Sequence, residues 1–334
     1  MIDNMFLVST DVESIGHLTK SFFEKRKDLF ERFNNEWTYK LFNPDNLTES
    51  YLRVTAIKFG KVLLIQGSIR KWYYGDISLN DFTKDDFEYA IRRLLSLLEI
   101  PFSRAKYIHC ARIEIGMNVR IGVPCSEMLN MITGFRNNCY KWTYRCNSKK
   151  YETGVMSLNI YNKIEEISKN FPLIKTLDEE QFLKETKDKN ILRLEFTVKG
   201  GKSKVEKRLG FNTLSETIKN FNQLFLFFDA NLKDLELNEK YKDLPKYNGA
   251  SGRDATTFLK LRGICSMGED EYQRLLSEVD RRTRKTIKDL MNSWQANHIS
   301  YGKVAFWKDV RRDIILAMLR SGCLKLRHQL STSA

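Results

Sequence analysis

Three segments of the sequence alternate between apolar and polar residues, and this alternation constrains the fold more than any other feature. They cover residues 112–119, 157–163 and 192–198. Successive side chains of a β-strand point to opposite faces of a sheet, so each segment predicts a strand with one apolar and one polar face. If the strands share one sheet, their polar residues meet on one face: Arg112, Glu114, Asn118, Tyr161, Lys163, Arg193 and Glu195.

That set of side chains suits attack on a phosphodiester. Two carboxylates can hold a divalent metal, cations stabilise charge on a phosphoryl group, and a tyrosine oxygen can act as the nucleophile. The structural alternative is that Glu114 and Glu195 only form ion pairs with the neighbouring arginines. Tyr161 would then pack as tyrosines commonly do in strands. From these residues alone, the structural alternative is the simpler one.

The order of the three segments resembles the gene II/X family of phage and plasmid replication initiators. The residues that carry the resemblance are 112–118 (RIEIGMN), 160–163 (IYNK) and 192–196 (LRLEF), followed by a short basic helix and Leu209-Gly210. The opening three residues (MID) also look like the start of that family, and the resemblance covers about residues 1–235. The family is similar to the rolling-circle plasmid initiators, which nick DNA through a tyrosine.

The resemblance implies a mechanism in which Tyr161 attacks the scissile phosphate. The products would be a 5′-phosphotyrosyl enzyme and a free 3′-hydroxyl that a host polymerase extends. Glu114, Glu195 and Asn118 would hold Mg²⁺ or Mn²⁺. The four histidines include no His-x-His pair, so we expect no histidine ligands.

The resemblance also assigns roles to the cations and implies partners. Lys163, Arg112 and Arg193 would lower the pKa of the phenol or bind phosphate. The partners would be origin DNA, single-stranded or supercoiled, together with a host helicase and polymerase in the bacterial cytoplasm. One candidate tyrosine stands out, so a second subunit of a homodimer, or water, would resolve the covalent intermediate.

Two other functions fit the same residues. A relaxase or transposase with the same tyrosine chemistry would nick at transfer origins or element ends. A noncatalytic nucleic-acid-binding protein would bind in a salt-sensitive manner and would not cleave a strand.

The charge of the chain favours a polyanionic partner. Its 56 Lys and Arg against 42 Asp and Glu give a net charge of +14. Residues 67–75 interleave Arg70 and Lys71 with aromatics, which suits single-stranded DNA, although packing of the aromatics in the core is an equal alternative. The other cations expected to bind DNA are Lys202, Lys204, Arg281 and Arg282.

Composition also indicates in which cell compartment the protein is expected. The six cysteines include no Cys-x-x-Cys pair, which favours free thiols in a reducing cytosol. No apolar run reaches the length needed to span a membrane. We therefore expect a soluble protein without a membrane partner.

The pattern predicts an α+β fold, with a mostly antiparallel sheet, helices packed on one face and an open catalytic face. Residues 1–235 would form the catalytic domain. Residues 236–253 contain Pro245 and Asn248-Gly249 and would be a linker. Residues 254–334 would be a smaller basic helical module, which either anchors duplex DNA by its phosphates or caps the catalytic domain.

Periodicity and turn chemistry predict further elements. Apolar spacing predicts one helix over residues 12–33, and turn residues predict a loop over 37–47. Two β-rich runs joined at Gly60-Lys61 predict a hairpin, and Thr83 caps a predicted helix. A polar turn at residues 147–150 is expected to precede one strand over 151–163.

Overall fold

The protein is described from a computed structural model. It describes residues 1–323 except 34–36, 46–49, 58–60, 76–77, 137–141, 144–147, 170–180, 182–188, 238–239, 242–255, 261–262, 265–268 and 302.

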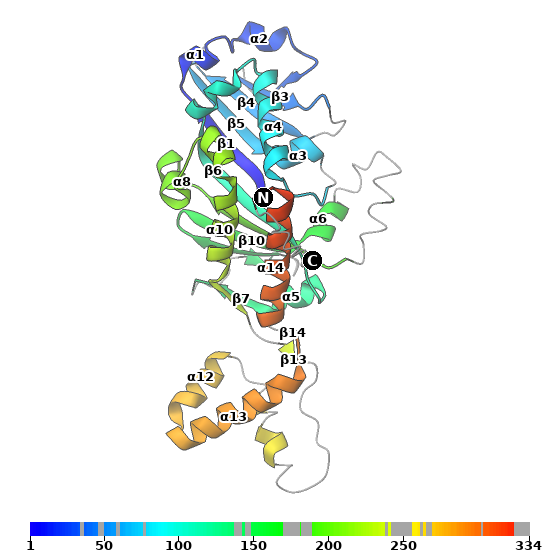
Figure 1. The fold of residues 1–334 in the computed structure, drawn as a ribbon, viewed down its shortest axis with the longest axis vertical. Coiled ribbons are helices and arrows are strands. Elements are labelled where there is room, and N and C mark those ends of the chain that lie inside the picture. The colour runs from blue at the N-terminus through cyan, green and yellow to red at the C-terminus, as the bar shows by residue number, and fades with distance from the viewer. Residues whose placement is uncertain are drawn as a thin grey trace, which may run out of the picture.

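A ten-stranded sheet lies at the centre of the described part, and all its neighbouring strands are antiparallel (Figure 1). The strands in spatial order are β2 (Phe30–Arg32), β3 (Thr38–Phe42), β4 (Tyr51–Ile57), β5 (Val62–Ser68), β1 (Ile2–Ser9), β6 (His109–Arg120), β11 (Ile191–Val198), β10 (Met156–Asn162), β9 (Ser148–Thr153) and β8 (Trp142–Thr143). The three alternating segments form β6, β11 and β10, which are consecutive in the sheet.

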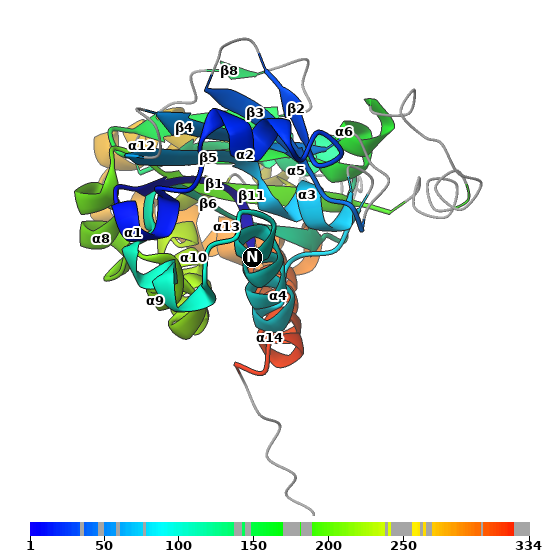
Figure 2. The same cartoon turned by 90° about the horizontal axis from the view of Figure 1, so that it is seen from above.

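Helices cover the apolar face of this sheet. They are α4 (Lys84–Leu97), α8 (Lys202–Leu209), α9 (Leu214–Lys219), α10 (Phe221–Leu232) and α14 (Lys303–Arg320). Figure 2 shows α4, α9, α10 and α14 on one side of the strands. Ile113, Ile115 and Met117 of β6 are at most 1% exposed on this side. Burial of each side chain of this size stabilises the fold by about 1.5–3 kcal/mol. The combination of this sheet with covering helices confirms the predicted α+β class.

The opposite, polar face is not open along its whole length. Two short helices follow strands at one end of it: α3 (Ile69–Tyr74) after β5 and α6 (Lys163–Lys169) after β10. Residues 78–83 connect α3 to α4 and contribute contacts to the same end. The predicted open face is therefore partly covered where Tyr161 lies.

The remaining elements are smaller or peripheral. They are α1 (Val12–Ile15), α2 (Lys20–Glu24), the 3₁₀ helix η1 (Phe102–Tyr107), α5 (Cys125–Met131), β7 (Ile132–Phe135), β12 (Leu235–Leu237), β13 (Lys240–Tyr241), α12 (Glu269–Glu278), α13 (Arg281–His298) and β14 (Ile299–Tyr301). No helix among the described residues combines the length and apolarity needed to cross a membrane.

The C-terminal helices divide between two cores. Phe306, Val310 and Ile314 of α14 belong to the core of the sheet domain, although α14 lies within the predicted module of residues 254–334. Ile264 and Met291 form a separate small cluster in the region of α12 and α13. In Figure 1 these two helices lie below the sheet, beyond β13 and β14. One predicted module thus supplies both a cap on the sheet and a separate helical part. Most of the predicted linker 236–253 lies outside the described residues.

The single helix expected over residues 12–33 was wrong. The structure has α1 and α2 there, followed by β2. Thr19 begins a new helix, because its side chain accepts a hydrogen bond from the Phe22 amide at 3.4 Å. The apolar residues bury themselves against a strand instead: the ring of Phe23 stacks on Tyr39 of β3 at 4.1 Å. The same strand replaces part of the loop expected over residues 37–47.

The region before Tyr161 also differs from its prediction. Residues 148–150, expected in a turn, belong to β9, and the expected single strand over 151–163 is a hairpin of β9 and β10. Gly154 adopts a φ of +58° between the two strands, a left-handed conformation that favours glycine. The predicted hairpin of β4 and β5 and the Thr83-capped helix α4 are confirmed.

Candidate active site

The polar residues of β6, β11 and β10 lie in cross-strand rows near one end of the sheet. Asn118, Arg193 and Tyr161 occupy one row, and Gly116 and Glu195 are paired in the next. Opposite residues of an antiparallel pair lie close enough for their side chains to interact. The register therefore brings a phenol, a guanidinium and a carboxyl group together.

Tyr161, Glu195 and Arg193 form the central contact of this site. The Tyr161 hydroxyl donates a hydrogen bond to Oε1 of Glu195 at 2.9 Å, and Nε of Arg193 donates to the same oxygen at 3.0 Å. Arg193 is fully buried, Glu195 is 9% exposed and Tyr161 is half-buried. The phenol thus faces a carboxylate that a cation holds in place.

Further carboxylates hold Arg193 itself. Its Nη2 donates to Oδ2 of Asp3 at 2.9 Å, and its Nη1 donates to Oδ1 of Asp81 and, at 3.2 Å, to Oδ1 of Asn118. A buried charge is stable only when it is paired and hydrogen-bonded. Arg193 therefore has one well-defined position, and this position orients Glu195.

Gly116 provides the space that this arrangement needs. A Cβ atom on Gly116 would lie 2.7 Å from Nη2 of Arg193 and 2.9 Å from Cγ of Glu195. Both distances are shorter than normal Cβ contacts. The absence of a side chain on β6 thus lets the Arg193 side chain lie across the strand.

The pKa values at the site favour a protonated phenol and a titrating carboxyl group. Burial and then the charge of Glu195 raise the pKa of Tyr161, against a lowering effect of Arg193. Burial raises the pKa of Glu195 to about 7, with Asp3 and Glu114 adding to the rise and Arg193 opposing it. Arg193 thus acts on the phenol in the expected direction, but burial and the charge of Glu195 outweigh it, so the net pKa is raised. Glu195 instead has the pKa of a general base that works near neutrality.

Lys163, the second predicted catalytic residue, contacts a different partner. It begins α6, is fully buried and donates from Nζ to Oε2 of Glu166 at 2.6 Å. Burial and then Arg70 lower the pKa of Lys163 to about 8. Lys71 donates to the other oxygen of Glu166 at 3.0 Å, so both lysines bind α6 rather than the Tyr161 hydroxyl.

A pocket of about 220 Å³ opens beside Tyr161. Residues of β10 and α6 form most of its lining, among them Asn159, Tyr161, Asn162, Glu165 and Glu166. Tyr161 lines this pocket, whereas its hydrogen-bonding partner Glu195 and Arg193 do not.

Two of the three predicted metal ligands fit a divalent cation. Glu114 and Glu195 are diagonal neighbours on one face, and carboxylate oxygens suit Mg²⁺ or Mn²⁺. Oε1 of Glu114 pairs with Arg112, and the Oε2 atoms of Glu114 and Glu195 receive no hydrogen bond from the described residues. Asn118 does not fit, because its amide oxygen accepts from Arg193 and its amide nitrogen donates to the Leu79 carbonyl at 2.7 Å. The described residues contain no group of three or more His, Cys, Asp or Glu arranged to hold a metal.

Several residues expected to bind DNA are buried in the interior instead. Arg70 is fully buried and its Nε lies 3.3 Å from Oδ2 of Asp3, so its guanidinium cannot reach a phosphate in this conformation. Trp72 is also buried, which favours the packing interpretation of residues 67–75. Arg193 is buried as described above, whereas Arg112 is partly exposed beside Glu114.

The other predicted DNA contacts are exposed but distant from Tyr161. Lys202 and Lys204 lie on α8, which begins beside Ala111 of β6. Ala111 is seven residues from Asn118 along an extended strand, or about 23 Å. These lysines therefore lie near the opposite end of the sheet from the Tyr161 row.

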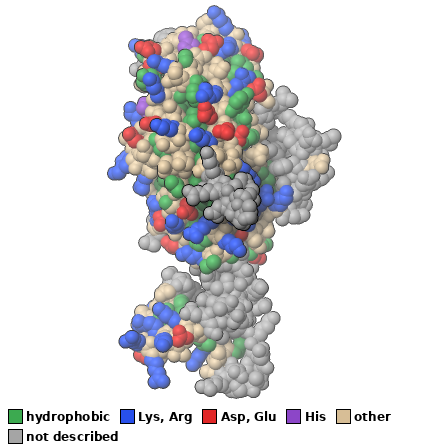
Figure 3. Space-filling model, in the orientation of Figure 1, with side chains coloured by type: hydrophobic (Ala, Val, Ile, Leu, Met, Phe, Trp, Pro, Cys, Tyr) green, Lys and Arg blue, Asp and Glu red, His purple; other side chains and the backbone are tan. Residues whose placement is uncertain are grey.

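Arg281 and Arg282 lie in the separate helical part. Both are exposed at the start of α13. Asp280 caps that helix by accepting hydrogen bonds from the amides of Arg282 at 2.8 Å and Thr283 at 3.1 Å. Figure 3 shows Lys and Arg side chains gathered on this part of the molecule.

Sequence reasoning missed three residues of the site: Asp3, Asp81 and Gly116. A glycine inside a predicted strand indicates close approach by another group, so Gly116 had a usable signal. Asp81 had none, because it comes from an irregular segment whose path depends on the packing of α3 and α4.

Comparisons with known proteins give little further information. No model of a known protein family matches the chain, and no curated protein matches it by sequence. Among solved structures, it is similar to the rolling circle replication initiator protein from Geobacillus stearothermophilus, with 9% identity and a TM-score of 0.36. That match covers 79% of this chain and 96% of the other. A likeness this distant does not assign a function to the chain.

Proposed function

We propose that the protein is a replication initiator that nicks one strand of an origin, with Tyr161 as the nucleophile and Glu195 as its general base. The observation that carries the proposal is the 2.9 Å hydrogen bond from the Tyr161 hydroxyl to Oε1 of Glu195, beside an open pocket. A nucleophile hydrogen-bonded to a base that a third group orients is the usual arrangement in covalent catalysis.

The chemical step balances within these residues and the DNA. The Tyr161 oxygen forms a bond to phosphorus while its proton passes to Glu195. The bond from phosphorus to the 3′ oxygen breaks, and that oxygen takes a proton from solvent. The products are a 5′-phosphotyrosyl protein and a free 3′-hydroxyl that serves as a primer.

The remaining residues position this pair. Arg193 keeps Oε1 of Glu195 directed at the phenol, and Asp3 and Asp81 keep Arg193 in place. Glu114 and Glu195 would hold Mg²⁺ or Mn²⁺, with substrate oxygens and water as the other ligands. The metal would supply charge stabilisation at the scissile phosphate.

The basic start of α13 suits a second role, the anchoring of duplex DNA. Its exposed arginines follow a capped helix end in a part of the chain that has its own small core. Lys and Arg contacts to phosphates supply affinity without reading sequence. A host helicase, a host polymerase and a second subunit or water that resolves the adduct complete the proposed cycle in a bacterial cytoplasm.

The proposal is tested by trapping the covalent product. The protein is incubated with Mn²⁺ and labelled single-stranded or supercoiled circles of its own replicon, and the products are separated on denaturing gels. We expect a protein–DNA band that Tyr161→Phe abolishes. Tyr107→Phe is the matched control, because Tyr107 is an exposed tyrosine far along the sequence, in η1.

The alternatives predict other outcomes of the same experiment. Salt-sensitive binding without any cleavage of circles that contain the true origin would contradict the proposal and favour a noncatalytic binding protein. Nicking at transfer origins or element ends, with none at a replication origin, would favour a relaxase or transposase.

A further inference from the structure

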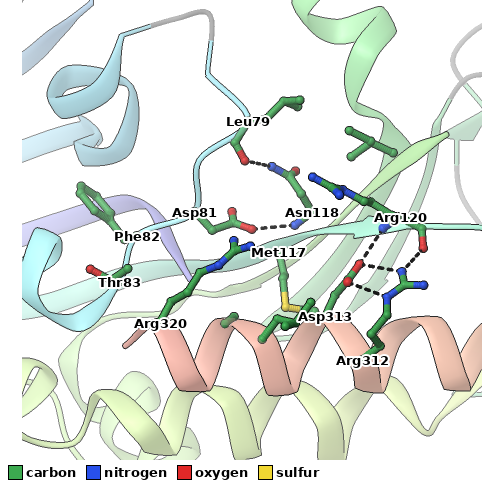
Figure 4. A pocket seen from close by; sticks show the side chains of 13 residues that line it. Leu79, Asp81, Phe82, Thr83, Met117, Asn118, Arg120, Arg312, Asp313 and Arg320 are labelled. Atoms are coloured by element: carbon green, nitrogen blue, oxygen red, sulfur yellow. Dashed lines mark hydrogen bonds and ion pairs between the residues drawn. The ribbon is translucent and has the colours of Figure 1, made fainter. Parts of the chain in front are cut away.

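A second cavity, of about 350 Å³, lies at the same end of the sheet as Tyr161 but on the side of α14 (Figure 4). Its walls come from the end of β6, the start of β11, residues 79–83 and the last turns of α14. This volume is at the lower end of the range of small-ligand sites, about 300–1,000 Å³.

The charges in this cavity are unbalanced. Its two carboxylates already have partners: Asp81 pairs with Arg193, and Asp313 pairs with Nε of Arg312 at 3.0 Å. In contrast, the side chains of Arg120 and Arg320 make no hydrogen bond or ion pair with the described residues. Figure 4 shows Arg320 reaching from α14 toward Asp81. Two guanidiniums without partners at one cavity favour an anionic ligand.

The cavity also offers apolar surface. Leu316 is 41% exposed and Leu79 is half-buried, and both belong to the lining. A phosphate alone would leave this surface in water, whereas a nucleotide would place its sugar and base against it.

Two residues connect this cavity to the candidate active site. Asp81 lines the cavity and accepts hydrogen bonds from Nη1 of Arg193 and, at 2.9 Å, from the Asn118 amide. Asn118 also lines it and lies in the row of Arg193 and Tyr161. β6, which forms one wall of the cavity, lies two strand spacings, or about 10 Å, from β10, the strand of the proposed nucleophile.

From these observations we infer that the cavity between β6, α14 and residues 79–83 is a nucleotide-binding subsite. Arg120 and Arg320 bind the phosphate, and Leu79 and Leu316 contact the sugar and base. The subsite takes a nucleotide of the single strand near the scissile phosphate, and in this respect the inference rests on the proposed function.

The test compares two double variants that remove equal charge from the full chain. Arg120→Ala with Arg320→Ala empties the subsite of unpaired cations. Lys308→Ala with Arg311→Ala is the control, because both residues are exposed on α14 outside the lining. Binding of a deoxynucleoside monophosphate is measured by calorimetry, and binding of a labelled short single strand by fluorescence anisotropy at fixed ionic strength. Thermal melting of both variants verifies that they fold.

We expect the subsite variant to bind both probes about tenfold more weakly, since each lost guanidinium removes charged hydrogen bonds. The control should change affinity less than about twofold, because exposed charges contribute little. A loss confined to the short strand would still support the subsite and would identify the ligand as part of DNA rather than a free nucleotide. Equal weakening by both variants, or by neither, would overturn the inference.

The same variants separate this inference from the proposed function. In one outcome, wild type and the subsite variant form the Tyr161 adduct at the same rate and with the same dependence on substrate concentration. In that case the inferred subsite is wrong and the nicking proposal stands. If wild type forms no adduct but the subsite variant alone loses nucleotide binding, the nicking proposal is wrong and the subsite stands.

Discussion

Glu195 is the residue on which the proposed chemistry depends, because the phenol beside it stays protonated near neutral pH. Burial raises the pKa of both groups, so neither is an ordinary surface side chain. The structural alternative, in which Glu114 and Glu195 form ion pairs with the neighbouring arginines, is met for both carboxylates: Arg112 pairs with Glu114, and Arg193 pairs with Glu195. It does not describe Tyr161, whose hydroxyl bonds to a shared carboxylate. Strand alternation predicted that Tyr161 and Glu195 lie on one face of the sheet. It did not predict their pKa values, because these depend on burial by segments far away in the sequence.

A general base with a pKa of about 7 predicts the pH dependence of nicking. Glu195 accepts a proton only when ionised, so kcat/KM should rise about tenfold per pH unit below the pKa of Glu195, which is about 7 without metal, and level off above it; bound Mg²⁺ or Mn²⁺ shifts this rise to lower pH. Glu195→Gln should reduce the rate roughly 10²-fold or more and remove this dependence. Single-turnover nicking between pH 5.5 and 8.5 measures both effects. Glu152→Gln on β9 is the control, and an unchanged profile in Glu195→Gln would exclude the assigned role.

Asp3 should contribute strongly to stability. It pairs with Arg70 and Arg193, and the two guanidiniums hold its pKa well below the usual range although burial opposes them. Asp3→Asn leaves both cations short of a partner and should cost about 3–5 kcal/mol in urea unfolding at pH 7. Glu31→Gln, which breaks an exposed pair with Lys40, should cost under about 1 kcal/mol.

The lowered pKa of Asp3 also determines how its contribution to stability changes with pH. Its pKa is lower in the folded than in the unfolded chain, so its contribution is present at neutral pH and is lost as the pH falls through the lowered value. The difference between wild type and Asp3→Asn should therefore narrow in acid. A cost no larger than that of Glu31→Gln at pH 7 would show that the buried pairs do not form.

Among the elements, strands were predicted better than helices. Alternation located β6, β10 and β11 because the apolar side chains of each strand recur at every second residue, although the polar side chains Arg193 and Glu195 of β11 are buried as well. The expected helix over residues 12–33 failed because Thr19 starts a new helix and because its later apolar residues pack against β3. The short helix α3 was also missed. Cations interleaved with aromatic residues give the same sequence pattern whether they lie on a DNA-binding surface or in a buried helix.

The element that tests duplex anchoring most clearly is α13. Arg281→Ala with Arg282→Ala should weaken binding to unrelated duplexes by similar factors, because phosphate contacts carry no sequence information. The slope of log affinity against log salt should fall by about 2, close to one unit per lost cation. Titrations between 50 and 200 mM salt measure this, with the α14 double variant Lys308→Ala and Arg311→Ala as control. An unchanged slope would remove α13 from the interface.

Considered as a whole, the molecule is a sheet domain with a helical cap and a separate basic helical part. The sequence predicted the α+β class. It left open whether the C-terminal helices anchor DNA or cap the catalytic domain, and α14 packs in the core of the sheet domain. Phe306, Val310 and Ile314 supply an apolar face whose partner, α10 and β6, lies far away in the chain. Such long-range packing leaves no local signal, and the same holds for the contact of Asp81 with Arg193.

Peptide mapping of the covalent adduct tests the central claim most directly. The trapped protein–DNA complex is digested with nuclease and protease, and mass spectrometry locates the residue that retains a nucleotide. We predict a phosphotyrosyl bond on Tyr161, in the peptide that contains residues 157–163, with the nucleotide attached through its 5′ phosphate. A nucleotide on any other residue, or attachment through a 3′ phosphate, would contradict the assignment of Tyr161 as the nucleophile that leaves a 3′ primer.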